Sequence, residues 1–222
     1  MEHANNLQAR RLAGTLTLVG SLCMLGGAAV WGSTGVDMDQ ALDTGDLVGY
    51  LNSAAVHRTA LIVNLSVWIL GVFLLGAAAR LMALLSRTNV LGSLLVRYNY
   101  GVGIPLVIVS YMAWMAVVVR LPGQDVASVA PIAEVVGWFG VRADWLATIM
   151  VLGLGPFLIV RAGRGSWVPG WLSVWGQLCL VPGVLTLIGM YCGGMTTYGF
   201  LIIPMGMAWM IAASVVLLRR PA

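Results

Sequence analysis

The sequence contains no lysine, only two histidines and only three cysteines in 222 residues. All twelve basic residues are therefore arginine, and charged residues make up only 9% of the chain. Without lysine, no side chain can form the Schiff base of a retinal protein. Two histidines are too few for the His and acid clusters of a metal-dependent intramembrane hydrolase, and no C-x-x-C dithiol motif is present. We therefore predict no cofactor and no bound metal.

Apolar residues, in contrast, make up 60% of the chain, whereas soluble domains contain roughly 45–50%. A helix needs about 20 apolar residues to cross the hydrocarbon core of a membrane, and it satisfies its backbone polar groups internally. The short alternating segments of a membrane β-barrel are not seen. We predict an all-α polytopic membrane protein, residues 1–222 forming one domain with six transmembrane helices. The predicted spans are residues 12–31, 59–85, 101–119, 143–160, 170–191 and 198–218.

The arginines predict how the chain is threaded. When the loops are assigned alternately, nine arginines fall on the N-terminal side and three on the other, so the positive-inside rule predicts a cytoplasmic (inner) membrane protein with both termini in the cytoplasm. Seven of the eight acidic residues fall on the outer side. The net charge of +4 then reflects topology and anionic lipid, and does not indicate nucleic-acid binding. The three outer arginines are Arg58, Arg120 and Arg142, and the outer acids are Asp37, Asp39, Asp43, Asp46, Asp125, Glu134 and Asp144.

Two outer loops are long. In the first, residues 32–58, the stretch from Asp46 to Arg58 predicts a short surface helix. In the second, residues 120–142, Pro131 and Gly137 predict a broken segment lying at the membrane interface. Tryptophans favour such interfaces, and we expect Trp31, Trp138 and Trp145 at the outer one and Trp167 and Trp171 at the inner one.

No charged residue is expected in the middle of a span, because Asp144 is placed at the outer start of the fourth. A carboxylate proton relay is therefore disfavoured. The neutral polar residues expected at depth include Asn64, Tyr111 and Gln177, whose usual role is hydrogen bonding between helices. If they lined a continuous passage, they would instead favour a permease.

The stretch GMYCGGMTTYG, residues 189–199, lies between the last two spans. Its Gly193-Gly194 pair predicts a hairpin turn, since glycine adopts positive φ without steric cost. Met190, Cys192 and Met195 are weak candidates for a copper(I) site, because thioether and thiolate ligands select that ion. Methionines in a helix bundle more often pack as apolar side chains.

Two stretches, ARRLAG before the first span and PFLIVRAGRGSWVPGWLSVWG around the fourth and fifth, resemble a family of six-span bacterial membrane proteins known as domain of unknown function 4386. The chain departs from the family pattern at Gly170, where a second arginine is expected, and at Ser173, where glycine is expected. The resemblance implies a six-helix bundle and assigns no activity. The matching residues are Arg11, Ala13, Gly14, Arg58, Arg161 and Pro169.

The lack of buried charge and of catalytic clusters favours a non-enzymatic membrane protein. It would be an accessory subunit that binds a partner, or a small permease for a neutral or apolar solute. Membrane lipids, a second copy of the chain or another membrane protein are the expected partners. The alternative is a membrane enzyme acting on a lipid or isoprenoid at the outer leaflet, with His57, Arg58, Asp144 and Tyr198 at one site. Convergence of these four side chains on a common cavity would support the enzyme.

Overall fold

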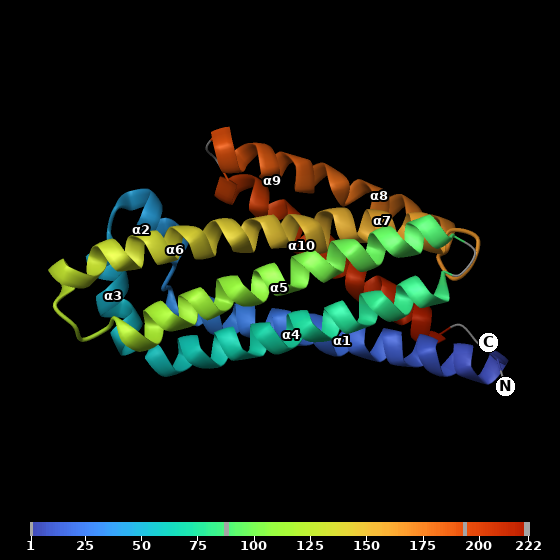
Figure 1. Cartoon of the computed structure of the whole chain (residues 1–222), viewed down its shortest axis with the longest axis horizontal. Helices are drawn as coiled ribbons and strands as arrows, with labels where there is room; N and C mark the ends of the chain where they lie inside the picture. The colour runs from blue at the N-terminus through green and yellow to red at the C-terminus, as the bar shows by residue number, and fades with distance from the viewer. Residues whose placement is uncertain (1, 87–88, 193–194, 220–222) are drawn as a thin grey trace.

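The computed structural model describes residues 2–86, 89–192 and 195–219, and these residues form helices joined by short turns, with no β-strand among them (Figure 1). Within this part of the chain, six helical segments are long and apolar enough to cross a membrane. The fold is thus an all-α six-helix bundle, as predicted. The segments are Asn6–Thr34, Arg58–Leu85, Val90–Arg120, Ser128–Gly163, Gly170–Tyr191 and Leu201–Arg219.

Four spans are single helices and two are composite. The single helices are α1 (Glu2–Thr34), α4 (Arg58–Leu85), α5 (Val90–Arg120) and α10 (Met195–Arg219). The fourth span consists of α6 (Val126–Thr148), the π-helical segment η1 (Ile149–Leu154) and α7 (Gly155–Gly163). The fifth consists of α8 (Gly170–Leu178) and α9 (Leu180–Cys192).

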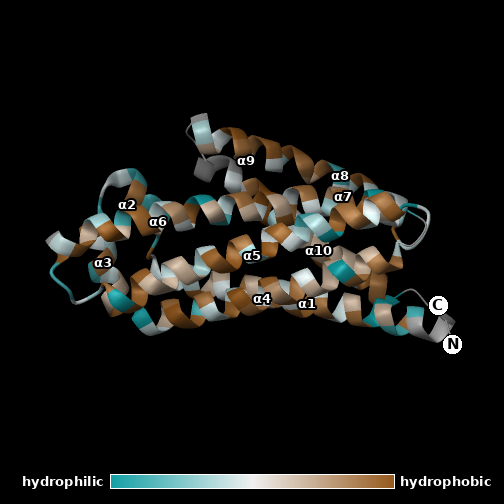
Figure 2. Cartoon of the chain, viewed as in Figure 1, coloured by the Kyte–Doolittle hydropathy of each residue, from teal (hydrophilic) through white to brown (hydrophobic). Residues whose placement is uncertain are grey.

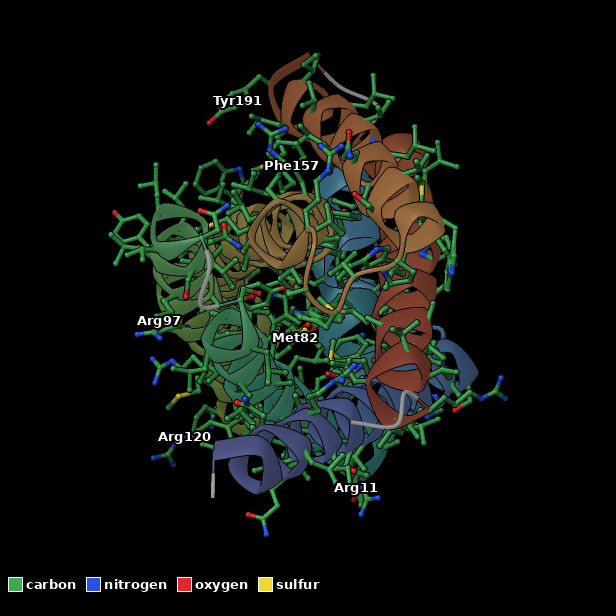
Figure 3. The ribbon with its side chains drawn as sticks, turned by 90° about the vertical axis from the view of Figure 1, so that its right-hand side faces the viewer. Arg11, Met82, Arg97, Arg120, Phe157 and Tyr191 are labelled. Atoms are coloured by element: carbon green, nitrogen blue, oxygen red, sulfur yellow. The ribbon has the colours of Figure 1, made fainter. Side chains whose placement is uncertain are left out.

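The spans form a ring in which neighbours along the chain are mostly neighbours in space. Helix α1 packs against α4 and α10, α4 against α5, and α5 against α6 and α7. Helix α9 packs against η1 and α10, and so closes the ring. Viewed from the end at which α1 begins, Met82 lies among the helices, whereas Arg11, Arg97 and Arg120 point away from the bundle (Figure 3).

The third and fourth spans begin earlier than the sequence analysis predicted. Helix α5 begins at Val90 instead of residue 101, so Arg97 lies on the helix and not in a loop. Helix α6 begins at Val126, and the expected interfacial segment is its first part. Pro131 and Gly137 do not break it. Pro131 is the sixth residue of α6 and costs the helix one backbone hydrogen bond, yet the helix continues through it. Gly137 packs directly against the end of the Met38 side chain, which would have to move to admit a Cβ atom.

The first long loop folds into two short helices, α2 (Met38–Thr44) and α3 (Leu47–Val56). Helix α3 is the predicted surface helix, whereas α2 was not predicted. Each helix is capped by an aspartate: Asp37 accepts a hydrogen bond of 2.9 Å from the backbone N–H of Asp39, and Asp46 accepts one of 2.8 Å from Gly49. Such caps satisfy N–H groups that have no partner within the helix.

Hydrophilic residues gather mainly near the two ends of the bundle, whereas its length is mostly hydrophobic (Figure 2). Helix α1 begins and α10 ends at one end, and α2 and α3 lie at the opposite end (Figure 1). The end at which α2 and α3 lie is the α2–α3 end, and it also contains the connection between α5 and α6. The segments at this end carry Asp37, Asp39, Asp43, Asp46 and Asp125, in agreement with the predicted separation of acids from most arginines. Which end faces the cytoplasm stays a prediction.

Candidate functional site

A partly open cavity of about 230 Å³ lies in the half of the bundle nearest to the α2–α3 end. Its walls come from α1, α4, α5, α6 and α10, and α2 contributes to its mouth. An engineered apolar cavity of about 150 Å³ holds benzene, so this space has room for a substituted aromatic ring. The lining is Met24, Leu25, Ala28, Trp31, Val36, Asp37, Met38, Asp39, Tyr50, Leu61, Asn64, Leu65, Trp68, Tyr111, Trp114, Val118, Val141, Asp144, Trp145, Thr148, Leu152, Ile203 and Met207.

Four aromatic rings follow one another along the cavity wall. The ring centroids of Trp31 and Trp68 are 6.4 Å apart, those of Trp68 and Tyr111 are 5.2 Å apart, and those of Tyr111 and Trp114 are 5.8 Å apart. Tilted pairs at these separations are favourable for aromatic side chains. The four rings are called the aromatic wall below.

Backbone contacts hold this wall in place. Trp68 donates from Nε1 to the carbonyl of Met24 (3.0 Å), and Asn64 donates from Nδ2 to the carbonyl of Gly27 (2.8 Å). A side chain at residue 27 would collide with the Trp68 indole, so glycine is needed there for the approach of α1 to α4. Trp31 donates to the carbonyl of Val36 (2.9 Å) and ties the end of α1 to the turn before α2.

The Asp144 carboxyl lines the cavity opposite α1. It interacts with the Tyr111 hydroxyl of α5 and lies within electrostatic range of Asp39 of α2. Its Oδ1 atom is buried and has no hydrogen-bond partner among the described residues. The neighbouring Tyr111 lies nine residues before the end of α5 at Arg120, or about 14 Å along the helix at 1.5 Å per residue. Asp144 therefore lies near the middle of the segment Ser128–Gly163, and not at the start of the fourth span where the sequence analysis placed it.

Helix α2 covers part of the mouth. Trp145 donates from Nε1 to Oδ2 of Asp39 at 3.2 Å, which joins α6 to α2 beside Asp144. Burial raises the pKa of Asp39 above its ordinary value of 3.8, and nearby Asp43 and Asp37 act in the same direction. The hydrogen bond from Trp145 and the charge of Arg142 oppose this rise in pKa. On the other side of Trp145, its ring packs against Gly199 of α10, where a side chain would collide with it.

The π-helical segment η1 lies at the inner limit of the cavity, where Thr148 and Leu152 contribute to the lining. The Met150 carbonyl accepts from the backbone N–H of Gly155, five residues on. Pro156 follows in α7 and has no N–H to donate, so the next carbonyl, that of Val151, lacks the corresponding backbone donor. Tyr100 donates from its hydroxyl to the carbonyl of Val151 (3.0 Å), and Asn99 donates from Nδ2 to that of Met150 (2.8 Å). π-Helical turns occur frequently at functional sites.

Residues of α1 and α10 that line the cavity are also exposed on the outside of the bundle. Helices α1 and α10 are in close contact at Gly14, which packs against Leu217 and Leu218. Nearer the α2–α3 end, Leu25 of α1 and Ile203 of α10 both line the cavity yet keep 44% and 43% of their surface exposed.

The structure brings only some of the sequence-predicted site residues together. Asn64, Tyr111 and Asp144 line the cavity, but His57 and Arg58 are not part of its lining. Arg58 instead donates to the carbonyl of Val119. Gln177 is exposed on α8 and donates to Ser173, so the three neutral polar residues do not line one passage. Met190 is partly buried against apolar residues near α2 and α3.

Some residues of the predicted metal site, the predicted enzyme site and the predicted turn lie outside the part of the chain that the structure describes. The side chains of Cys192, Met195 and Tyr198 and the expected turn at Gly193–Gly194 lie outside the described residues. Among the described residues, no group of three His, Cys, Asp or Glu side chains is placed to hold a metal ion.

The aromatic wall was missed in the sequence analysis. Trp68 and Trp114 were not singled out, and Trp31 was expected only at the interface. Their spacing carries a partial signal: Asn64 and Trp68 are four residues apart, so the amide and the indole share one face of α4. That this face meets α1, α5 and α6 depends on helix packing, which a single sequence does not show.

Comparisons with known proteins returned no match: no family model, no curated protein and no solved structure is significantly similar to this chain. The resemblance to the family of six-span bacterial membrane proteins thus stays a prediction. The comparisons leave the cavity and its residues as the basis for functional inference.

Proposed function

We propose that this chain is a membrane protein that binds a small, largely apolar organic solute in the cavity, as a permease or solute receptor would. The observation that supports this proposal most is the cavity itself, which is lined by five spans and by the aromatic wall. Ligand sites in proteins are typically concave and mostly apolar, with a few polar groups that orient the ligand. Asn64, Tyr111 and Asp144 would serve as those polar groups.

Leu25 and Ile203 both line the cavity and are partly exposed on the outside of the bundle, which supports entry from the bilayer, where apolar solutes concentrate. The mouth near α2 supports exchange with the aqueous side, because Val36, Asp37 and Tyr50 also line a second pocket of about 220 Å³ between α2 and α3. Access from both phases is what movement of a solute between lipid and water requires.

The enzyme alternative has less support. Among its candidate residues with described side chains, only Asp144 lines the cavity. The other carboxyls of the lining, Asp37 and Asp39, lie at the mouth near α2. Among the described lining residues there is no histidine, cysteine, serine or lysine to serve as the base or nucleophile that hydrolysis or group transfer uses. The accessory-subunit alternative stays a prediction, because no partner chain is present in the structure.

The proposed binding site is tested by blocking it. Ala28 and the adjacent Ala29 on α1 are both exposed, but only Ala28 lines the cavity. Purified protein in lipid nanodiscs is titrated with two probes of the same shape, tert-butylbenzene and phenyltrimethylammonium, and binding is followed by quenching of tryptophan fluorescence.

We expect at least one of the two probes to bind saturably, with Ala28→Phe abolishing the binding and Ala29→Phe leaving it unchanged. Saturable binding that survives Ala28→Phe, or absence of binding of both probes to the unaltered protein, would contradict the proposal.

A further inference from the structure

We infer that the cavity takes an organic monocation, with Asp144 as its counter-charge and the aromatic wall as the surface on which the cationic group rests. The inference builds on the proposed function and narrows the solute to a charged class. It departs from the neutral solute that the sequence analysis favoured, because that expectation assumed no charged residue within a span.

Among the described residues, no cationic group is one of those that act on Asp144. The groups that act on it are the Tyr111 hydroxyl from α5 and the Asp39 carboxyl from α2. The cavity residues from α1, α4 and α10 are uncharged. Arg142, on the same helix, acts on Asp39 and lies over the Trp138 ring at 5.7 Å. A carboxylate buried without a cation is costly, so a bound ligand cation would stabilise its ionised form.

The aromatic wall fits the same kind of ligand. Tryptophan and tyrosine ring faces attract cations that lie within about 6 Å of the ring centroid, and aromatic cages are a recurrent site for ammonium groups. Trp68, Tyr111 and Trp114 are consecutive rings of this wall, and Tyr111 also interacts with Asp144. The ring faces and the carboxyl therefore lie next to each other in one cavity.

The size and chemistry of the cavity favour an organic cation over a metal ion. Hard cations such as Ca²⁺ require six to eight oxygen ligands, whereas most residues that line this cavity are apolar or aromatic. The volume of about 230 Å³ accommodates an aromatic ring that bears a substituted ammonium group. Asp37 and Asp39 at the mouth add negative charge along the entry path.

The probe pair tests the charge directly, because phenyltrimethylammonium and tert-butylbenzene differ only in the positive nitrogen that replaces a carbon. We expect the cation to bind at least tenfold more tightly than the neutral probe. Asp144→Asn should weaken binding of the cation at least tenfold and leave the neutral probe unchanged. Asp43→Asn, which removes an exposed carboxyl of α2 outside the cavity, is the matched control and should alter neither affinity.

Equal affinity for the two probes, or cation binding that Asp144→Asn leaves intact, would overturn the inference. If both probes bind equally and Ala28→Phe blocks both, the proposed solute site stands and only the charge assignment fails. If neither probe binds, both proposals fail.

Discussion

The packing of α2 against Gly137 yields the most detailed prediction. A Cβ atom at residue 137 would lie 2.6 Å from Sδ and 2.9 Å from Cε of Met38. These atoms end a flexible side chain and can move by a small amount, so alanine is tolerated better than leucine. Overpacking of a filled site costs roughly 1–3 kcal/mol. We expect Gly137→Leu to weaken the attachment of α2 to α6 by about this amount.

The assay measures how often α2 detaches. Ala41 on the buried face of α2 is 6% exposed, and Ala41→Cys introduces a thiol there that a water-soluble maleimide reaches only when α2 lifts. Because 1.4 kcal/mol corresponds to about a tenfold change in an equilibrium, Gly137→Leu should accelerate labelling of that thiol roughly fivefold to a hundredfold. Peptide mass spectrometry separates this thiol from the native cysteines.

The matched control is Gly101→Leu on α5, a position at which an added Cβ meets no atom within 4 Å. It should leave the labelling rate unchanged. If Gly137→Leu and Gly101→Leu have the same rate as the parent, then α2 does not rest on Gly137, and the account of the cavity mouth is wrong.

Two further predictions concern the π-helical segment η1 at the inner limit of the cavity and Asp39 at its mouth. Tyr100→Phe removes the hydroxyl that donates to the Val151 carbonyl. It should lower the free energy of unfolding by about 1–3 kcal/mol, the cost of an unsatisfied buried polar group, and thermal unfolding measures the loss. The control is Tyr98→Phe, at a residue that is 72% exposed, which should match the parent. The pKa of Asp39 is raised by burial, so its contribution to stability is present below pH 3.8 and is lost as the pH rises through the raised pKa. The melting temperature of Asp39→Asn relative to the parent should therefore increase with pH above 3.8, and a constant difference would show that this carboxyl does not titrate abnormally.

The sequence predicted the helices better than their ends or their contacts. Long apolar runs identify spans whatever surrounds them, which is why all six were found. The starts of α5 and α6 were missed because Arg97, Pro131 and Gly137 interrupt the apolar pattern but not the helix. Arg97 points away from the bundle (Figure 3), and Gly137 receives Met38 from a helix that was not predicted.

The candidate site was only partly predictable for a related reason. Asn64 and Tyr111 were found because polar groups are rare at depth in apolar spans. Asp144 was assigned to a span end, since the fourth span was thought to begin at residue 143. The aromatic wall joins α1, α4 and α5, and its formation depends on which helix faces meet, which the pattern of a single chain leaves open.

The most direct test of the central claim is to locate the ligand in the protein. A structure determined with 4-bromophenyltrimethylammonium should show anomalous scattering from bromine inside the cavity, with the ammonium group between Asp144 and the rings of Trp68 and Tyr111. Bromine signal at a different place in a saturated sample, or an ammonium group directed away from Asp144, would contradict the account.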